Sequence, residues 1–205
     1  LKAAVVDCLQ DKTLRISFAL LIVVTVFAVG LFEPMLPYIV RNIYLVENDL
    51  ATASLSIAVG IGLIIGAVIF TRYFQDRTDD VRLMSLCAIP LPLAIPLVID
   101  TTLPIAFATI CAAGAYIGLV ATNFMYQVEV AKNLRFRSAT RALFIFSWSG
   151  LSGFSSAGYG VLIDTAGLRT IFYGVFVFLP VLLITYDRII EPRIMVMTSG
   201  SKANG

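Results

Sequence analysis

The chain has 205 residues, a formal net charge of +2 and 59% apolar residues, with a mean hydropathy of +0.93. So large an apolar share leaves too little polar surface to cover a water-soluble globule, so the composition argues against a soluble protein with buried core helices. The chain has no histidine and only three cysteines, Cys8, Cys87 and Cys111, without paired spacing. This pattern argues against a disulfide framework and against a zinc or haem centre, and we expect no metal and no cofactor.

Six long blocks without charged residues follow one another along the chain. They are 17 to 28 residues long and cover 16–32, 50–71, 83–99, 101–128, 142–163 and 170–186. A helix of about 20 apolar residues crosses a hydrocarbon core. Because backbone groups in lipid must be hydrogen-bonded within the protein, helices are the economical structure for these blocks. The sequence therefore predicts an all-α membrane protein with six transmembrane helices.

The basic residues are divided unevenly between the two sides of the membrane that six crossings define. Of the 15 Lys and Arg residues, all but Arg41 and Arg169 fall on the side of the two termini. By the positive-inside rule, both termini are predicted to be cytoplasmic. We expect a cytoplasmic segment over 1–13, a membrane bundle over 14–190 and a cytoplasmic tail over 191–205. The positive loops then face anionic membrane lipid, and no nucleic-acid partner is expected.

Glu33 is the acidic residue that the sequence places well inside a span, and two helix-bending prolines, Pro34 and Pro37, follow it. An ionisable group inside the bilayer costs about 2.5–3.5 kcal/mol at the helix centre and usually faces a cavity. We predict that Glu33 couples transport to protons or recognises a cationic substrate. The alternative is a structural carboxylate held by Arg41 or by polar neighbours.

Two further spans carry polar or aromatic residues at helical spacing. Such side chains are unfavourable against lipid, so both stripes are predicted to face inward, as a cavity wall or as contacts between helices. The fourth span carries Thr109, Tyr116, Asn123 and Gln127, and the fifth carries Trp148, Ser152, Ser155 and Tyr159. The candidate substrate-binding residues, besides Glu33, are Tyr116, Asn123, Gln127, Trp148 and Ser152.

Small residues recur at intervals that let two helices approach closely. The second span has Ala58, Gly62 and Gly66, and the fifth has Ser149, Gly153, Ser156 and Gly160. Plain helix packing is the expected role of these glycines.

Two connecting segments are weakly alike. Residues 160–169 read Gly-Val-Leu-Ile-Asp-Thr-Ala-Gly-Leu-Arg, and residues 72–82 begin Arg-Tyr-Phe-Gln-Asp-Arg. With three spans in each half they fall on opposite sides of the bilayer, as in an inverted-topology repeat. The first segment resembles the loop signature of the major facilitator superfamily, G-x-L-x-D-x-x-G-x-R, at every specified position. The second resembles a degenerate copy, with Arg72 and Asp79 where the signature has glycine.

The resemblance extends to the span lengths and loop sizes of the second half of such a transporter. Residues 31–37, Leu-Phe-Glu-Pro-Met-Leu-Pro, also resemble an element in the seventh helix of vesicular amine transporters and drug:proton antiporters. The resemblance implies a 3+3 inverted repeat, alternating access, and an N-terminal six-helix half in the same polypeptide. The chain begins with Leu1 rather than Met, and we expect six spans to precede it. The gating residues so implied are Asp76, Arg77, Arg82, Asp164, Gly167 and Arg169.

The function expected from these features is proton-coupled export of small organic or cationic molecules. Carriage of sugars or organic acids as a uniporter or symporter remains an alternative, as does a six-span channel or carrier that self-associates. An enzyme is not expected. Residues 150–153, Gly-Leu-Ser-Gly, match the segment around the nucleophile of rhomboid proteases, but that serine needs a general base and the chain has no histidine.

Overall fold

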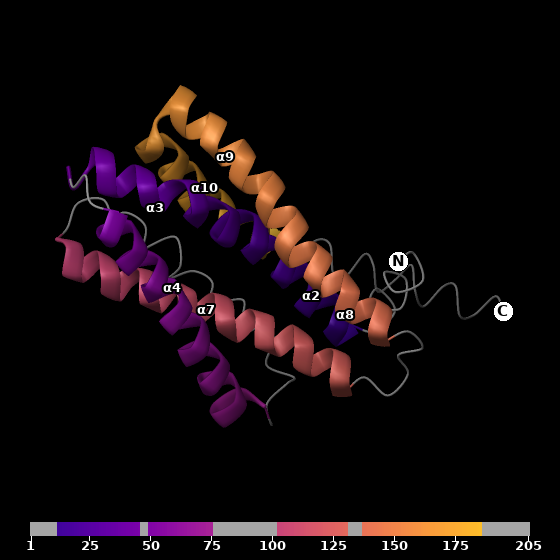
Figure 1. Cartoon of the computed structure of the whole chain (residues 1–205). Coiled ribbons are helices and arrows are strands. Elements are labelled where there is room, and N and C mark those ends of the chain that lie inside the picture. Colours follow the sequence, from indigo (N-terminus) through magenta and orange to yellow (C-terminus); the bar gives the residue numbers. More distant parts are fainter. Residues whose placement is uncertain (1–11, 46–48, 76–101, 131–136, 186–205) are drawn as a thin grey trace.

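The computed structural model describes residues 12–45, 49–75, 102–130 and 137–185, and every regular element in these ranges is a helix (Figure 1). The first helical stretch consists of α2 (Lys12–Val24), a five-residue π-helical turn η1 (Thr25–Val29) and α3 (Gly30–Asn42). The second consists of α4 (Asp49–Ile69) and a π-helical turn η2 (Phe70–Phe74). These bounds place the first two predicted spans in helices.

The later elements are α7 (Leu103–Val130), α8 (Arg137–Ile145), the π-helical turn η3 (Phe146–Leu151), α9 (Ser152–Ala166) and α10 (Leu168–Thr185). They coincide with the fourth, fifth and sixth predicted spans. The third predicted span, 83–99, lies outside the described residues. The structure therefore confirms the all-helical class.

Three stretches within the described residues are long and apolar enough to cross a membrane: Leu14–Asn42, Asp49–Phe74 and Leu103–Val130. A helix of 26 to 29 residues exceeds the about 20 needed, which leaves room for tilt. The chain thus has the helices of an integral membrane protein. The α8–α9 stretch is more polar because serine and glycine recur along it.

The first stretch is longer than the uncharged block that predicted it. The helix runs on from Phe32 to Asn42, through Glu33, Pro34 and Pro37. A proline inside a helix lacks the N–H that its turn would use, and transmembrane helices tolerate this loss through local adjustments and neighbouring groups. Glu33 therefore lies on a helix rather than at its end.

The first helical stretch lies between α7 and α9 in the described bundle (Figure 1), because α2 packs on α7 and α3 packs on α9, while α4 packs on α7. The end where α2 begins is also the end where α7 finishes and α8 begins, whereas α4 and α7 begin at the opposite end (Figure 1). The helix α9 packs along α3, and α10 packs on α9. The most deeply buried large side chains come mainly from the first stretch and from α7.

The seam between α4 and α7 is built from four glycines. A Cβ atom on Gly66 would lie 2.7 Å from the backbone nitrogen of Leu119 and would overlap the Ala115 carbonyl oxygen. The same holds for Gly62 against Cys111, and, from α7, for Gly118 against Leu63. Two pairs, Gly62 with Gly66 and Gly114 with Gly118, thus bring the two backbones into direct contact. The predicted packing role of the second-span stripe is confirmed.

The small-residue stripe of the fifth span behaves differently. Within the described part of the chain, a Cβ on Gly153 or Gly160 would meet nothing within 4 Å. The close approach on this helix is made by the neighbouring face instead, where Gly30 of α3 meets Ser155 and the Ser152 carbonyl oxygen. The prediction of close packing through Gly153 and Gly160 is therefore wrong for the described bundle.

Candidate functional site

The polar stripe of α7 points into the bundle. Asn123 is 1% exposed, Gln127 8% and Tyr116 9%, and Thr109 is half-buried. They are buried because α7 is covered on both sides, by α4 at its glycines and by α2 nearer its C-terminal end. The stripe thus forms part of the contact between helices.

A chain of hydrogen bonds joins this stripe to the first helical stretch. Gln127 Nε2 donates to Asn123 Oδ1 over 3.4 Å, and Asn123 Nδ2 donates to Ser17 Oγ over 3.1 Å. Ser17, on α2, is fully buried. A serine hydroxyl can donate as well as accept, so this chain can be extended beyond Ser17. The arrangement links α2 to α7 at the end of the bundle where α2 begins.

A row of four aromatic rings includes the residues next to Ser17 and Asn123 in sequence. Phe18 lies 5.6 Å from Phe124, Phe124 lies 5.9 Å from Phe144, and Phe144 lies 5.9 Å from Trp148, measured between ring centroids. The last two pairs are nearly parallel, at 13° and 24°. These rings come from α2, α7, α8 and η3. Trp148, at the end of the row, is half-buried, so part of its ring lies at the surface of the described bundle.

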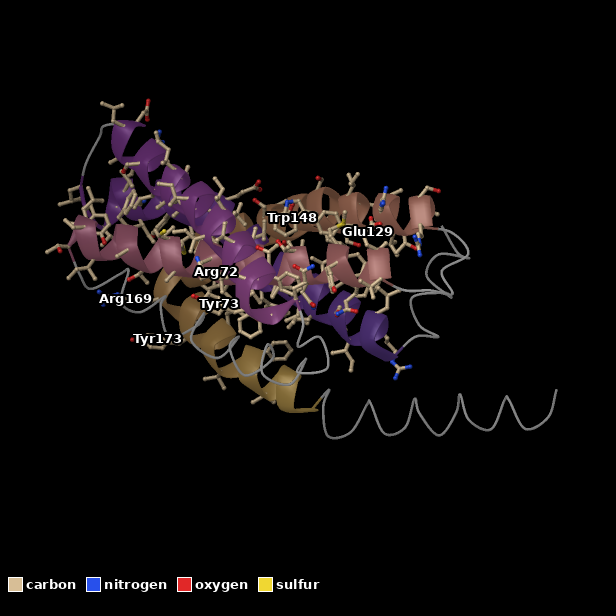
Figure 2. All side chains as sticks on the ribbon, turned by 90° about the horizontal axis from the view of Figure 1, so that it is seen from below. Arg72, Tyr73, Glu129, Trp148, Arg169 and Tyr173 are labelled. Carbon is tan, nitrogen blue, oxygen red and sulfur yellow. The ribbon has the colours of Figure 1, made fainter. Side chains whose placement is uncertain are left out.

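An ion pair closes the same end of the bundle at its edge. Arg141 of α8 binds Glu129 of α7, and both side chains are about half exposed. Figure 2 places Glu129 toward the end of the bundle where α8 begins. A surface ion pair is typically worth between about 0 and 1 kcal/mol, so this one orients α8 on α7 more than it stabilises the fold.

The stripe of the fifth span also turns toward the bundle. Ser152 is 7% exposed and Tyr159 8%, and both belong to α9. The hydroxyl of Ser152 donates to the Ser149 carbonyl oxygen over 3.3 Å, and that of Ser155 donates to the Ser152 carbonyl oxygen over 3.1 Å. These bonds lie within one helix. They leave the serine face compact enough for Gly30 to approach it.

Glu33 differs from its helical neighbours in being exposed. Phe32 before it is 7% exposed and Met35 after it is fully buried, whereas the Glu33 side chain lies on the open side of α3. Arg41 pairs with Asp49 at 3.8 Å and so joins the end of α3 to the start of α4. Among the described residues, Arg41 is therefore paired with Asp49 and not with Glu33.

The segment 160–169 forms the junction of α9 and α10. Gly167 has φ 81° and ψ 147°, a backbone conformation that is accessible essentially only to glycine. Its N–H donates to the Ile163 carbonyl oxygen over 3.0 Å, which ends α9, and α10 begins at the next residue. The glycine of the signature thus makes a one-residue turn possible. Asp164 and Arg169 flank this turn and are exposed.

In Figure 2, Arg169 and Tyr173 lie on α10, and Arg72 lies beside Tyr73 at the end of η2. The guanidinium of Arg72 lies 6.0 Å from the Tyr73 ring centroid. The other predicted gating residues, Asp76, Arg77 and Arg82, lie outside the described residues. The structure therefore places Asp164, Gly167 and Arg169 at or beside the α9–α10 junction, and the degenerate segment from Asp76 onward lies outside the described residues.

Sequence reasoning missed several buried polar residues. Arg15 was counted only as a topology marker, yet it is 4% exposed. Ser17, Thr25, Thr140 and Ser147 are each at most 2% exposed, although none was singled out. The sequence feature that could have identified these residues is a polar side chain inside or beside an apolar block. Within the described ranges no cluster of acidic or cysteine side chains is suited to a metal ion.

Replacing Asn123 with leucine should destabilise the bundle, because it leaves Ser17 and Gln127 without their shared partner. Interhelical hydrogen bonds in membranes are worth about 0.6 kcal/mol on average and up to about 1.7, so we expect a loss in this range. Unfolding in mixed micelles measures it. The matched control is Thr122→Val, because Thr122 is adjacent but bonds only to the Gly118 carbonyl oxygen of its own helix. If Ser17→Ala lowers the stability equally in the parent protein and in the Asn123→Leu variant, the hydrogen bond between Ser17 and Asn123 does not contribute to stability.

Comparison with protein-family models, with curated proteins and with solved structures yields no match for this chain.

Proposed function

We propose that this chain is part of a secondary active transporter of the major facilitator type, which exports small organic, preferably cationic, molecules in exchange for protons. The observation that carries the proposal is the position of Glu33. It is an exposed carboxylate on a helical stretch of 29 residues that is otherwise apolar enough to cross a membrane.

A carboxylate in such a place is unfavourable against lipid. Insertion scales put a charged group at the helix centre at about 2.5–3.5 kcal/mol, and intramembrane acids almost always face a bundle interior or a water-filled path. The described helices do not cover Glu33. A water-filled path beside α3 satisfies both conditions, and there a carboxylate can exchange a proton or bind a cation.

The finer topology belongs to the same proposal. It comprises six spans arranged as a 3+3 inverted repeat, cytoplasmic termini and an N-terminal six-helix half that rocks against this bundle. The uneven distribution of basic residues and the signature at 160–169 support it. In this arrangement the end where α2 begins is cytoplasmic.

The buried candidate residues fit alternating access in a specific way. Asn123, Gln127 and Ser17 are engaged with one another, and Ser152 is packed in the α3–α9 seam. We assign Trp148, which is half-buried, to contact with substrate in the present arrangement. Tyr116, Asn123, Gln127 and Ser152 reach substrate when the helices that cover them separate.

The test is transport by the full protein in sealed lipid vesicles with an imposed pH gradient. Accumulation of a lipophilic organic cation that collapses when the gradient is dissipated supports the proposal. Uptake of a neutral sugar or an organic acid instead would favour the alternative substrate classes. Proton leak that needs no added organic solute would indicate a channel formed by self-association.

A further inference from the structure

Thr25 carries a buried hydroxyl that the proposed transport site does not use. It is the first residue of η1, it is fully buried, and its Oγ1 has no hydrogen-bond partner among the described residues. Buried polar groups in folded proteins are nearly always hydrogen-bonded, because an unsatisfied one loses its hydration without compensation. The hydroxyl therefore needs a partner.

Other helical hydroxyls in this chain find one within their own helix. Thr71, Thr122 and Thr165 each donate to the carbonyl oxygen four residues earlier, over 2.8 to 3.1 Å. Ser or Thr residues bond in this way because an α-helix presents that carbonyl beside the side chain. At Thr25 the helix changes to π-helical hydrogen bonding, in which the Gly30 N–H bonds to the Thr25 carbonyl oxygen. Thr25 thus lies where α2 ends and this turn begins, and its hydroxyl makes no such bond.

A second π-helical turn lies against the first. The turns η1 and η3 are in contact, and the buried residues that they contribute include Thr25 from one and Ser147, 2% exposed, from the other. Thr25 lies near the middle of the 29-residue stretch Leu14–Asn42. Two irregular turns thus touch inside the bundle, and each of them buries a hydroxyl-bearing residue. In membrane proteins, ordered waters commonly satisfy the groups that such irregularities release.

We propose that the contact between η1 and η3 holds a buried water molecule, which accepts a hydrogen bond from the Thr25 hydroxyl and bridges the two turns. A water can make two to four hydrogen bonds with such groups and is neutral. A metal cation would require a compensating carboxylate, and the acidic residue of this stretch, Glu33, is exposed and lies beyond η1 on α3. The chemistry at Thr25 therefore favours water over sodium.

The direct test is water-edited solid-state NMR of the full protein in lipid bilayers, with threonine labelled. We expect magnetisation from water to reach Thr25 as fast as it reaches an exposed residue such as Thr165, although Thr25 is buried. Transfer as slow as that to the buried apolar side chains would overturn the proposal. This measurement needs no variant and so does not depend on whether a substitution folds.

The sign of a stability change gives an independent test. Thr25→Val removes the hydroxyl while nearly preserving shape, so it should lower the melting temperature by about 2–4 °C if the hydroxyl binds water. An increase would mean that the hydroxyl is dry and unsatisfied, because removing such a group is neutral or stabilising. Thr25→Ser, which keeps the hydroxyl, should fall between Thr25→Val and the parent.

A comparison with and without sodium tests whether Thr25 binds a cation rather than water. Melting temperatures are measured in NaCl and in choline chloride of equal ionic strength. We expect no difference that depends on Thr25. A saturable increase with sodium that Thr25→Val abolishes would replace the water by a cation. Transport activity is not the readout in any of these measurements, so their failure is distinguishable from failure of the proposed function.

Discussion

Gly66→Ala should destabilise the bundle by roughly 1–3 kcal/mol, the usual cost of overpacking a filled interior. The added methyl group would overlap the Ala115 carbonyl oxygen and lie 2.7 Å from the Leu119 backbone nitrogen. Backbone atoms cannot move aside as a flexible side chain can, so α4 would have to separate from α7. The apolar contacts along the whole seam would weaken as a result. Unfolding in mixed micelles or by heat measures the change.

Gly60→Ala is the matched control for this prediction. Gly60 lies on the same helix, and a Cβ atom there meets nothing within 4 Å. In the helix interior alanine is favoured over glycine by about 0.8–1.0 kcal/mol. The two substitutions, identical in chemistry, should therefore have opposite signs. Equal effects would contradict the close approach of α4 and α7.

The other side of the seam supplies a reciprocal test of the same geometry. A Cβ on Gly118 would overlap the Leu63 carbonyl oxygen, so Gly118→Ala should also destabilise. Because Gly66 and Gly118 act at one contact, the double variant should cost less than the sum of the two single changes. Full additivity would place the two glycines in separate contacts.

The stripe of Ala58, Gly62 and Gly66 on α4 shows which part of this seam could be predicted from the sequence. Glycines four residues apart predicted a close approach, and that much follows from side-chain size. The same reasoning did not identify the helix that packs against this stripe. Gly114 and Gly118 lie in the fourth span, where the polar stripe was the feature interpreted. The equally regular stripe of Gly153 and Gly160 turned out to face open space in the described bundle. Spacing indicates which surface permits contact, and only the tertiary arrangement decides which surface is used.

The polar residues show a related limit. Helical spacing correctly placed Asn123 and Gln127 on an inward face, because polar groups avoid lipid. Their partner Ser17 could not be identified, since it is 106 residues away in sequence. Thr25 was missed for a different reason. Thr25 lies at the start of a π-helical turn, which the amino-acid sequence does not predict. Gly167, by contrast, could be identified from its motif before its backbone conformation was known.

Glu33→Gln should abolish transport driven by a pH gradient while leaving the fold intact. The amide keeps the size and most hydrogen-bonding capacity of the side chain but can neither release a proton nor carry a negative charge. Because a charged group inside a span costs about 2.5–3.5 kcal/mol on insertion scales, removing it should leave stability unchanged or raise it. Transport and stability are thus expected to move independently. The assay is uptake of a lipophilic cation into sealed vesicles, paired with the melting temperature of the same preparation.

Asp49→Asn is the control for loss of an acidic side chain. Asp49 is exposed at the start of α4, where it pairs with Arg41, so its removal should cost at most about 1 kcal/mol and leave transport intact. Glu33→Asp supplies the complementary case, because it retains the charge and withdraws it by one methylene group. We expect it to keep part of the gradient-driven uptake.

Three results are then distinguishable for Glu33. Uptake that disappears in Glu33→Gln at unchanged or higher melting temperature, and persists in Asp49→Asn, supports a proton- or cation-binding role. Normal uptake by Glu33→Gln would eliminate that role. Uptake that disappears together with a lower melting temperature would make Glu33 a structural carboxylate, the alternative that its exposed position on α3 argues against. An isolated acid on an open face of an apolar helix has few structural contacts to lose, and this is why we expect the first result.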